Sequence, residues 1–254
     1  PRILIGKDTR KSGDMLEAAL TAGLCSMGAK VIPLGVVPTP AVAYLTRYYK
    51  ADAGVVISAS HNPCEYNGIK FFNSDGYKLS DGIENEIESY ILGEKAIEEL
   101  PTHGKVGYVS ANHNAVEDYV AFAVSTIDCR LDGMKIAVDC ANGASYETAF
   151  KALNKLGANV EAIHNTPDGV NINHMCGSTH MESLQAYVTS IGADIGIAFD
   201  GDADRMLAVD ENGKLIDGDQ IMAACAKFMR DNGTLKQNTL VATVMSNLGL
   251  FMAG

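Results

Sequence analysis

The chain alternates short apolar runs with longer segments in which apolar residues recur every three or four positions. The short runs are rich in β-branched residues and end at turn formers, which is typical of buried strands, whereas the longer spacing is typical of amphipathic helices. The predicted strands are 2–5, 31–34, 53–57, 135–139, 159–162, 195–199 and 239–243, and the predicted helices are 12–27, one capped by Thr39, 81–92, 115–127, 145–156, 181–191 and 219–230. A hairpin over 206–216 is expected to turn at Asn212-Gly213, a pair that favours tight turns.

The order of these elements predicts an α/β fold built from successive domains. Strands that alternate with helices favour mostly parallel sheets with helices on both faces, which gives three layers, α/β/α, in each domain. A chain of 254 residues is long enough for two ordinary domains. We therefore expect one domain over 1–114, a second over 115–213 and the beginning of a third over 214–254.

A polar loop follows the predicted strand 53–57 and contains Ser58, Ser60, His61 and Asn62. In open α/β sheets ligands bind at the carboxyl ends of the strands, so the Ser60 hydroxyl is a candidate nucleophile at such an edge. The alternative is that Ser60 or Asn62 only stabilises a turn, because both residue types are frequent in turns.

A second polar loop follows the predicted strand 195–199 and carries Asp200, Asp202 and Asp204. Because these carboxylates repeat with period two, they can share one side of an extended segment. Oxygen ligands of this kind suit a hard cation, and Mg²⁺ is favoured because it needs few protein carboxylates and keeps positions for water and phosphate. Arg205 either binds a phosphate or relieves repulsion among the aspartates.

The aspartate loop also resembles two other kinds of site, an EF-hand calcium loop and the nucleophile loop of a phosphatase. Asp200, Asp202, Asp204 and Glu211 match positions one, three, five and twelve of an EF-hand calcium loop, but Arg205 stands where that loop needs glycine. A phosphatase with Asp200 as its nucleophile is the other competitor. That hypothesis leaves the Ser60 loop without a role.

The composition indicates which binding partners are not expected for the protein and in which cellular compartment it should lie. The net charge of −11 with no basic run argues against nucleic acid and anionic membranes. No signal-peptide pattern or transmembrane run is present, and six cysteines without a Cys-x-x-Cys pair indicate reduced thiols. We therefore expect a cytoplasmic protein. Cys176 and His180 supply only half of a zinc site, so we do not predict one.

Several segments together resemble the α-D-phosphohexomutase family. The segments are 57–63, 67–70 and 200–205, joined by 6–10, 12–13, 38–40, 168–173 and 176–180. The last two are similar to the subgroup that acts on phosphorylated glucosamine. The resemblance covers essentially the whole chain and implies domains of the phosphohexomutase type.

The resemblance also implies a reaction. Ser60 would carry a phosphoryl group bound to one Mg²⁺, which is held by Asp200, Asp202 and Asp204. The enzyme would interconvert glucosamine 6-phosphate and glucosamine 1-phosphate through a bisphosphorylated sugar, a step toward amino-sugar nucleotides and cell-wall precursors. His61 and Lys70 are the candidates for proton transfer.

Arg10 and Arg205 are the candidates for binding substrate phosphate, and a homodimer is a further expectation. Relatives in this family have four domains and an earlier phosphate-facing loop, so we expect the sequence to be part of a longer protein and to lack mutase activity alone. Two alternatives stay open: a family member with a different sugar substrate, and a noncatalytic module that binds metal or phosphate.

Overall fold

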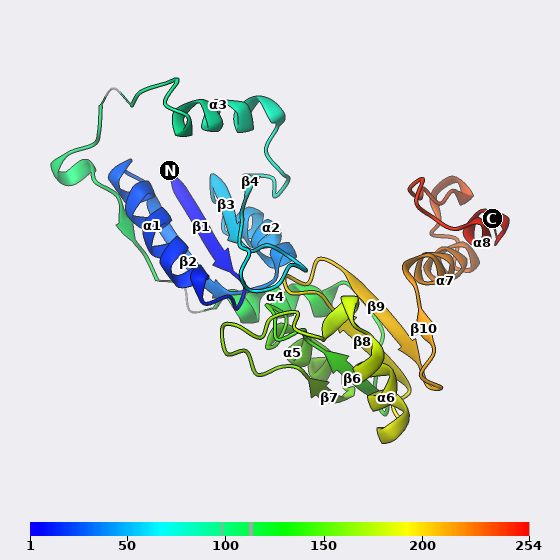
Figure 1. The fold of residues 1–254 in the computed structure, drawn as a ribbon. Coiled ribbons are helices and arrows are strands. Elements are labelled where there is room, and N and C mark those ends of the chain that lie inside the picture. Colours follow the sequence, from blue (N-terminus) through cyan, green and yellow to red (C-terminus); the bar gives the residue numbers. More distant parts are fainter. Residues whose placement is uncertain (98, 112–113, 254) are drawn as a thin grey trace.

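Two five-stranded sheets follow one another along the chain, each with helices on its faces (Figure 1). The structure is a computed structural model that describes residues 1–97, 99–111 and 114–253. The predicted α/β class is therefore confirmed. Within the described ranges, no helix is both long enough and apolar enough to cross a lipid bilayer.

The first sheet has the strand order β4-β3-β1-β2-β5. Its strands are β1 (Arg2–Lys7), β2 (Lys30–Val36), β3 (Ala53–Ile57), β4 (Ile69–Asn73) and β5 (Tyr108–Val109). All neighbours are parallel except β3 and β4. Helix α1 (Ser12–Ser26) packs on the face that carries Ile5, and α2 (Thr39–Tyr48) packs on the face that carries Leu4. Helix α3 (Asp81–Ile91) buries none of its residues.

The second sheet has the strand order β10-β9-β8-β6-β7. Its strands are β6 (Lys135–Asp139), β7 (Asn159–Ile163), β8 (Ile195–Phe199), β9 (Met206–Asp210) and β10 (Leu215–Ile216). The hairpins β8–β9 and β9–β10 are antiparallel, so this sheet is evenly mixed rather than mostly parallel. Helices α5 (Thr148–Lys155) and α6 (Glu182–Ile191) cover its opposite faces.

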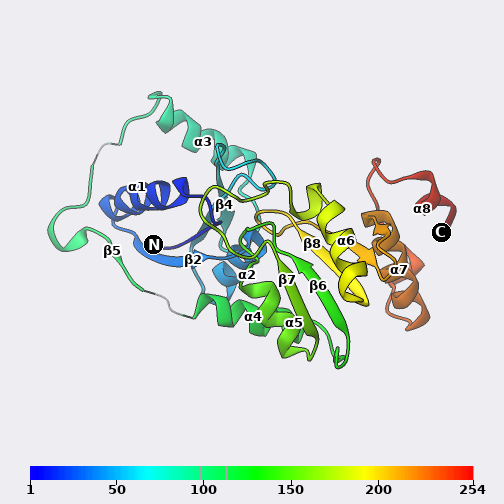
Figure 2. The same cartoon turned by 60° about the horizontal axis from the view of Figure 1, so that its bottom comes forward.

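Helix α4 (Ala115–Ser125) joins the two sheet regions. Its Ala115 and Tyr119 belong to the core beneath α2, and the ring of Phe122 stacks on Tyr44 with centroids 3.7 Å apart. The same helix packs against α5, and the views in Figure 1 and Figure 2 both place it where the sheets approach each other. Helix α4 thus connects the two regions, with apolar contacts on the side of α2 and helix packing on the side of α5.

The C-terminal part contains α7 (Gly218–Asp231) and α8 (Leu248–Ala253), which extend beyond the β10 edge in Figure 1. Asp217 and Gln220 form a capping box that fixes the start of α7. The predicted strand 239–243 is wrong, because no described strand pairs with this segment and Val241 is 85% exposed. An apolar, β-branched sequence forms a strand only where a neighbouring strand accepts its backbone hydrogen bonds.

Candidate functional site

The loops that follow β3 and β8 meet face to face, as the sequence resemblance implied. Each loop joins a strand to an antiparallel neighbour, β4 or β9. Gly201 makes the approach feasible: a side-chain carbon there would lie 2.7 Å from the carbonyl oxygen of Ser60. Only glycine allows the two backbones to come this close.

The Ser60 hydroxyl lies between an aspartate and an arginine. Its Oγ donates to Asp200 Oδ2 at 2.8 Å and accepts from Arg205 Nη2 at 2.8 Å. The Ser60 backbone has φ 53°, the left-handed region that non-glycine residues rarely adopt, and its amide donates to Ser58 Oγ. Such a conformation persists only where the surroundings hold it.

The three aspartates of the second loop form a compact group of oxygen atoms. One carboxylate oxygen from each of Asp200, Asp202 and Asp204 lies within 4.8 Å of the others, with Asp204 the most exposed. Asp202 Oδ2 accepts from Thr39 Oγ1 and Lys70 Nζ, both at 2.7 Å, whereas its Oδ1 is buried without a hydrogen-bond partner. An unpartnered buried acceptor beside two further carboxylates fits a hard cation.

The surroundings lower the pKa of one of these aspartates and raise the pKa of another. Burial alone would raise the pKa of Asp202, but the hydrogen bonds from Lys70 and Thr39 outweigh it and lower the pKa. Burial, followed by the charges of Asp202 and Asp200, raises the pKa of Asp204. The deeper carboxylate is therefore held in its charged form, while repulsion accumulates on the outer one.

Arg205 carries out one of its two predicted roles in this geometry. Its Nη2 and Nε donate to Asp200 Oδ2 at 2.7 and 3.1 Å, so it neutralises part of the aspartate charge. The same Nη2 lies 2.6 Å from His61 Nδ1. Since half of the Arg205 side chain is exposed, phosphate binding stays a prediction, as does proton transfer by His61.

Lys70 lies on the strand β4, which follows the Ser60 loop. Its ammonium group forms an ion pair with Asp202 and keeps 40% of the side chain exposed. A cation in this position connects the first sheet region to the aspartate loop. Proton transfer by Lys70 stays a prediction.

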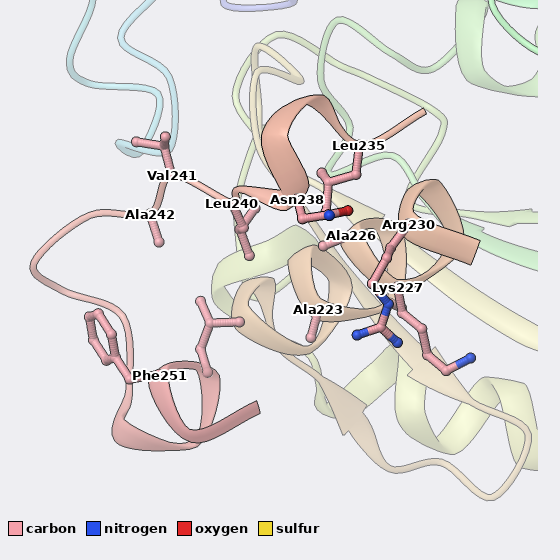
Figure 3. Close-up of a pocket in the computed structure, with 12 residues that line it drawn as sticks. Ala223, Ala226, Lys227, Arg230, Leu235, Asn238, Leu240, Val241, Ala242 and Phe251 are labelled. Carbon is pink, nitrogen blue, oxygen red and sulfur yellow. The ribbon is translucent and has the colours of Figure 1, made fainter. Parts of the chain in front are cut away.

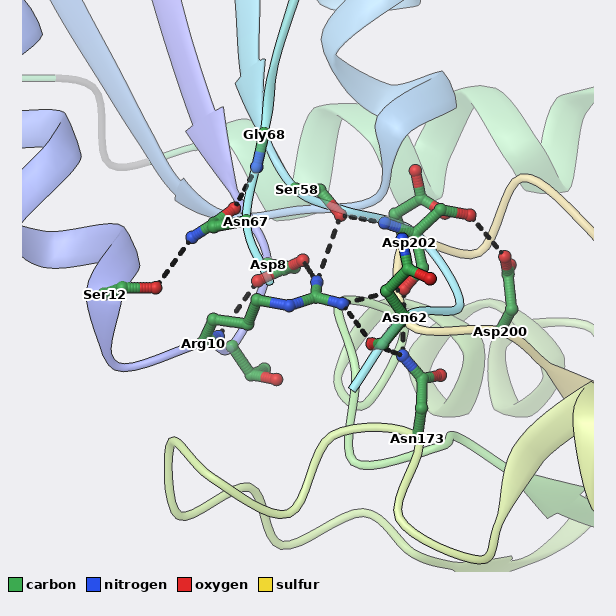
Figure 4. Close-up of polar contacts among 12 residues, drawn as sticks. Asp8, Arg10, Ser12, Ser58, Asn62, Asn67, Gly68, Asn173, Asp200 and Asp202 are labelled. Atoms are coloured by element: carbon green, nitrogen blue, oxygen red, sulfur yellow. Dashed lines mark hydrogen bonds and ion pairs between the residues drawn. The ribbon is translucent and has the colours of Figure 1, made fainter. Parts of the chain in front are cut away.

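Arg10 holds the backbone of the Ser60 loop from inside the first region. Its side chain is fully buried and forms an ion pair with Asp8, and Nη2 donates to the carbonyl oxygens of Ser60, at 3.1 Å, and Asn62 (Figure 4). Because these contacts occupy both terminal nitrogens of the guanidinium group, Arg10 here supports the loop. A contact with substrate phosphate stays a prediction.

Two residues, Asn173 and Thr39, contact the site in ways that the sequence analysis did not predict. Asn173 Nδ2 donates to Ser60 O and Asn62 O at 2.9 and 3.0 Å (Figure 4). Thr39, expected as a helix cap, instead directs its hydroxyl and its amide to Asp202. Asn173 and Thr39 lie within the motifs 168–173 and 38–40, but a sequence motif does not show which distant residue each side chain contacts.

The buried thiols lie elsewhere. Cys176 lies near Asp139 and His164, the three offering ligand atoms within 4.8 Å of one another. Both oxygens of Asp139 already accept hydrogen bonds from backbone amides, and burial, followed by the charge of Asp139, raises the pKa of Cys176 to about 12. This environment favours a neutral thiol rather than a metal ligand.

A cavity of about 740 Å³ lies between α7 and the segment that follows it (Figure 3). Ala223, Leu240 and Phe251 are among the apolar residues that line it, with Lys227 and Arg230 at one side. None of the residues that line it belongs to the Ser60 or aspartate loops. We therefore place the chemistry at those loops and not in this cavity.

Comparison with known proteins agrees with the geometry. Models of the "Phosphoglucomutase/phosphomannomutase, alpha/beta/alpha" domains I, II and III match residues 1–98, 116–213 and 217–253. Proteins named phosphoglucosamine mutase from Ruminiclostridium cellulolyticum and Acetivibrio thermocellus are 62% and 63% identical over 250 residues, which are 98% of this chain and 56% of each relative. The chain thus spans little more than half the length of these relatives.

A solved structure of a phosphoglucomutase/phosphomannomutase family protein from Burkholderia thailandensis has the same fold. It superposes with a TM-score of 0.77 at 27% identity and covers 91% of this chain and 51% of its own. Fold and sequence comparisons therefore point to the same group of proteins.

Proposed function

Because the chain belongs to the phosphoglucomutase/phosphomannomutase, or α-D-phosphohexomutase, family, we propose that its gene product is a phosphoglucosamine mutase. It interconverts glucosamine 6-phosphate and glucosamine 1-phosphate. The identity of about 60% to proteins of that name supports the choice of sugar. A cytoplasmic location belongs to this proposal, and the homodimer stays a prediction.

The observation that carries the proposal is the 2.8 Å contact between Ser60 Oγ and Asp200 in the three-aspartate group. Asp200, Asp202 and Asp204 would hold Mg²⁺, which when bound neutralises charge on phosphoryl oxygens next to Ser60. A serine next to this aspartate group can accept and give up a phosphoryl group, because the bound cation would compensate the negative charge of the phosphoryl oxygens.

The reaction then takes two transfers through Ser60. Ser60 Oγ gives its phosphoryl group to the free hydroxyl of the sugar phosphate, so one P–O bond breaks at serine and another forms on the sugar. The bisphosphorylated sugar returns its other phosphoryl group to Ser60 Oγ. Lys70 and His61 are the groups that accept and return the hydroxyl proton, and Arg205 stabilises the charge in transfer.

The test measures turnover by the full gene product on glucosamine, glucose and mannose 6-phosphates. We expect the highest kcat/KM on glucosamine 6-phosphate, and intact mass should show one phosphoryl group on the protein. Ser60→Ala should abolish both turnover and the added mass, whereas Ser80→Ala, which precedes α3 away from the loops, should change neither. A preference for mannose 6-phosphate would overturn the proposed substrate.

For residues 1–254 alone we propose a folded chain that accepts phosphate on Ser60 but has no useful turnover. Orientation of reactants contributes about 7–11 kcal/mol of barrier reduction, and groups that orient the sugar are expected beyond these residues. Turnover by 1–254 within about tenfold of the full gene product would contradict this account of positioning.

A further inference from the structure

We propose that Asn173 is a positioning residue that fixes the nucleophile loop of the first sheet region to the aspartate loop of the second. The inference rests on the proposed function. It is carried by a single amide group that reaches from one region to the other.

The contacts of this amide begin at the nucleophile itself. Asn173 Nδ2 donates to the carbonyl oxygens of Ser60 and Asn62, on either side of His61, at 2.9 and 3.0 Å. Asn173 is 7% exposed, so water does not replace these hydrogen bonds readily. Ser60 has a left-handed backbone that its surroundings must hold, so the hydrogen bonds to the two carbonyls fix the backbone from which its hydroxyl projects.

Arg10 donates to the same two carbonyls but from a different region. It follows β1, so it fixes the loop relative to the first sheet. Asn173 belongs to the second region, as the aspartates do, and a side-chain carbon at Gly201 would lie 2.6 Å from its Nδ2. The amide therefore touches both loops at one point, which sets the position of Ser60 relative to Asp200.

The segment that carries Asn173 is itself held firmly. At the end of β6, Asp139 Oδ2 accepts from the amide of Gly177 at 2.9 Å and lies 2.9 Å from His164 Nδ1. The backbone N–H of Asn173 donates to Ala141 O at 2.9 Å. A fully buried carboxylate thus anchors both ends of 164–177, and a rigid support is what a positioning side chain needs.

This arrangement also accounts for Asp139 and His164, which the proposed chemistry does not use. Asn173 has φ 57°, a conformation that asparagine tolerates better than most residues. Its backbone geometry and its amide are therefore both suited to this position. Displacement of a reacting group by about 1 Å can cost about a hundredfold in rate, so loss of the amide should act on kcat.

The test uses the full gene product with Asn173→Gly, which accepts the same backbone, and Asn173→Asp, which keeps the volume but removes the donor. Asn171→Asp is the matched control, since its Nδ2 donates within the loop to Thr166 O. We expect kcat to fall at least about tenfold in both Asn173 variants with KM within about twofold. The control should stay within about twofold of the unchanged protein.

A second readout separates this inference from the proposed function. The protein is first dephosphorylated with a phosphatase, and the initial rate at which Ser60 then gains a phosphoryl group from glucose 1,6-bisphosphate is followed by intact mass. If the unchanged protein gains none, the proposed function fails. If it gains one and folded Asn173→Gly gains it at the same rate, Asn173 has no positioning role, and a rise in KM at constant kcat would instead make Asn173 a substrate-binding residue.

Discussion

The two sheet regions have the same plan, and their chemistry lies at equivalent places. β1 and β6 are flanked by parallel strands on both sides, and β3 and β8 each lead through a polar loop into an antiparallel strand. One loop supplies a hydroxyl and the other supplies carboxylates. The comparison teaches that each region holds half of a site at the same edge of the same plan.

The two loops differ in what holds them. The aspartate loop closes on itself, since Asp200 Oδ1 accepts from the Arg205 amide at 3.2 Å and Ala203 N donates to Asp200 O at 3.0 Å. Both loops contain a left-handed residue, Ser60 in one and Ala203 in the other, but the carbonyl groups of the Ser60 loop are held from outside by Arg10 and Asn173. The aspartate loop therefore supplies part of its own support, whereas the carbonyl groups of the Ser60 loop depend on side chains outside that loop.

The regions also exchange contacts. Asn173 of the second region holds the loop of the first, and Thr39 of the first region contacts the loop of the second. Each half-site is therefore completed by a residue from the opposite region. Variants of the aspartate loop and of Thr39, which contacts Asp202, should affect metal binding, and variants of Asn173 should affect how the two loops work together.

Asp202→Asn should give the largest effect on the aspartate loop. It removes one charge and leaves Lys70 and Thr39 directed at a neutral amide, so Mg²⁺ affinity should fall and turnover should drop by orders of magnitude. Calorimetric titration of Mg²⁺ and turnover of the full gene product measure both. Glu211→Gln is the control, because an EF-hand would need that carboxylate; a loss of affinity in the control alone would restore the calcium interpretation.

Thr39→Val should give an intermediate effect that sharpens the comparison. The substitution keeps the shape of the side chain but removes a hydrogen bond to a buried carboxylate, worth about 1.5–3 kcal/mol. We expect the Mg²⁺ concentration for half-maximal activity to rise about tenfold or more, since about 1.4 kcal/mol corresponds to a factor of ten. Thr39→Ser should restore the unchanged value.

If Thr39→Val and the unchanged protein have the same Mg²⁺ dependence, the Thr39 hydroxyl does not support the aspartate loop. In that case, of the two exchanged contacts, only that of Asn173 acts from one region on the loop of the other. The melting temperature of both Thr39 variants is the control for folding. Lys70 holds the same oxygen and stays in place, so the loop should not unfold.

The sequence was sufficient to predict elements with strong apolar patterns, and insufficient where structure depends on distant partners. β3 and β8 have continuous apolar sequences, and the sequence predicts both strands and the polar loops that follow them. β4 was missed because it lies at the edge and keeps its residues only partly buried, and β5 because it spans two residues. The common plan of the two regions left no visible repeat in the sequence, because topology constrains burial rather than identity.

The contacts that complete the site were also beyond prediction from pattern. Asn173 lies 113 residues from Ser60, and Thr39 lies 163 residues from Asp202. Local propensity carries no information on such pairs. The aspartates and Ser60 were brought together by the resemblance, whereas the roles of the two exchanged residues came from the coordinates.

The smallest effect is expected at the helix that joins the two regions. On α4, Glu117 forms ion pairs with Lys151 and Lys155 of α5 at 2.7 and 2.9 Å, and these hydrogen bonds lower the pKa of Glu117 from 4.5 to about 2. Because the folded pKa is below the ordinary value, the stabilisation is present above pH 4.5 and is lost as the pH falls toward 2. These groups are exposed, so water and salt weaken the effect.

Glu117→Gln should therefore lower the melting temperature slightly near neutral pH and leave turnover unchanged. The difference from the unchanged protein should shrink as the pH falls below 4.5 and also as salt is added, because both remove the same charge interaction. Glu161→Gln removes a like charge from β7 of the same region and is the control. If the penalty of Glu117→Gln is the same at all pH values, its ion pairs with α5 do not stabilise the junction, and the other contacts between the two regions hold them together.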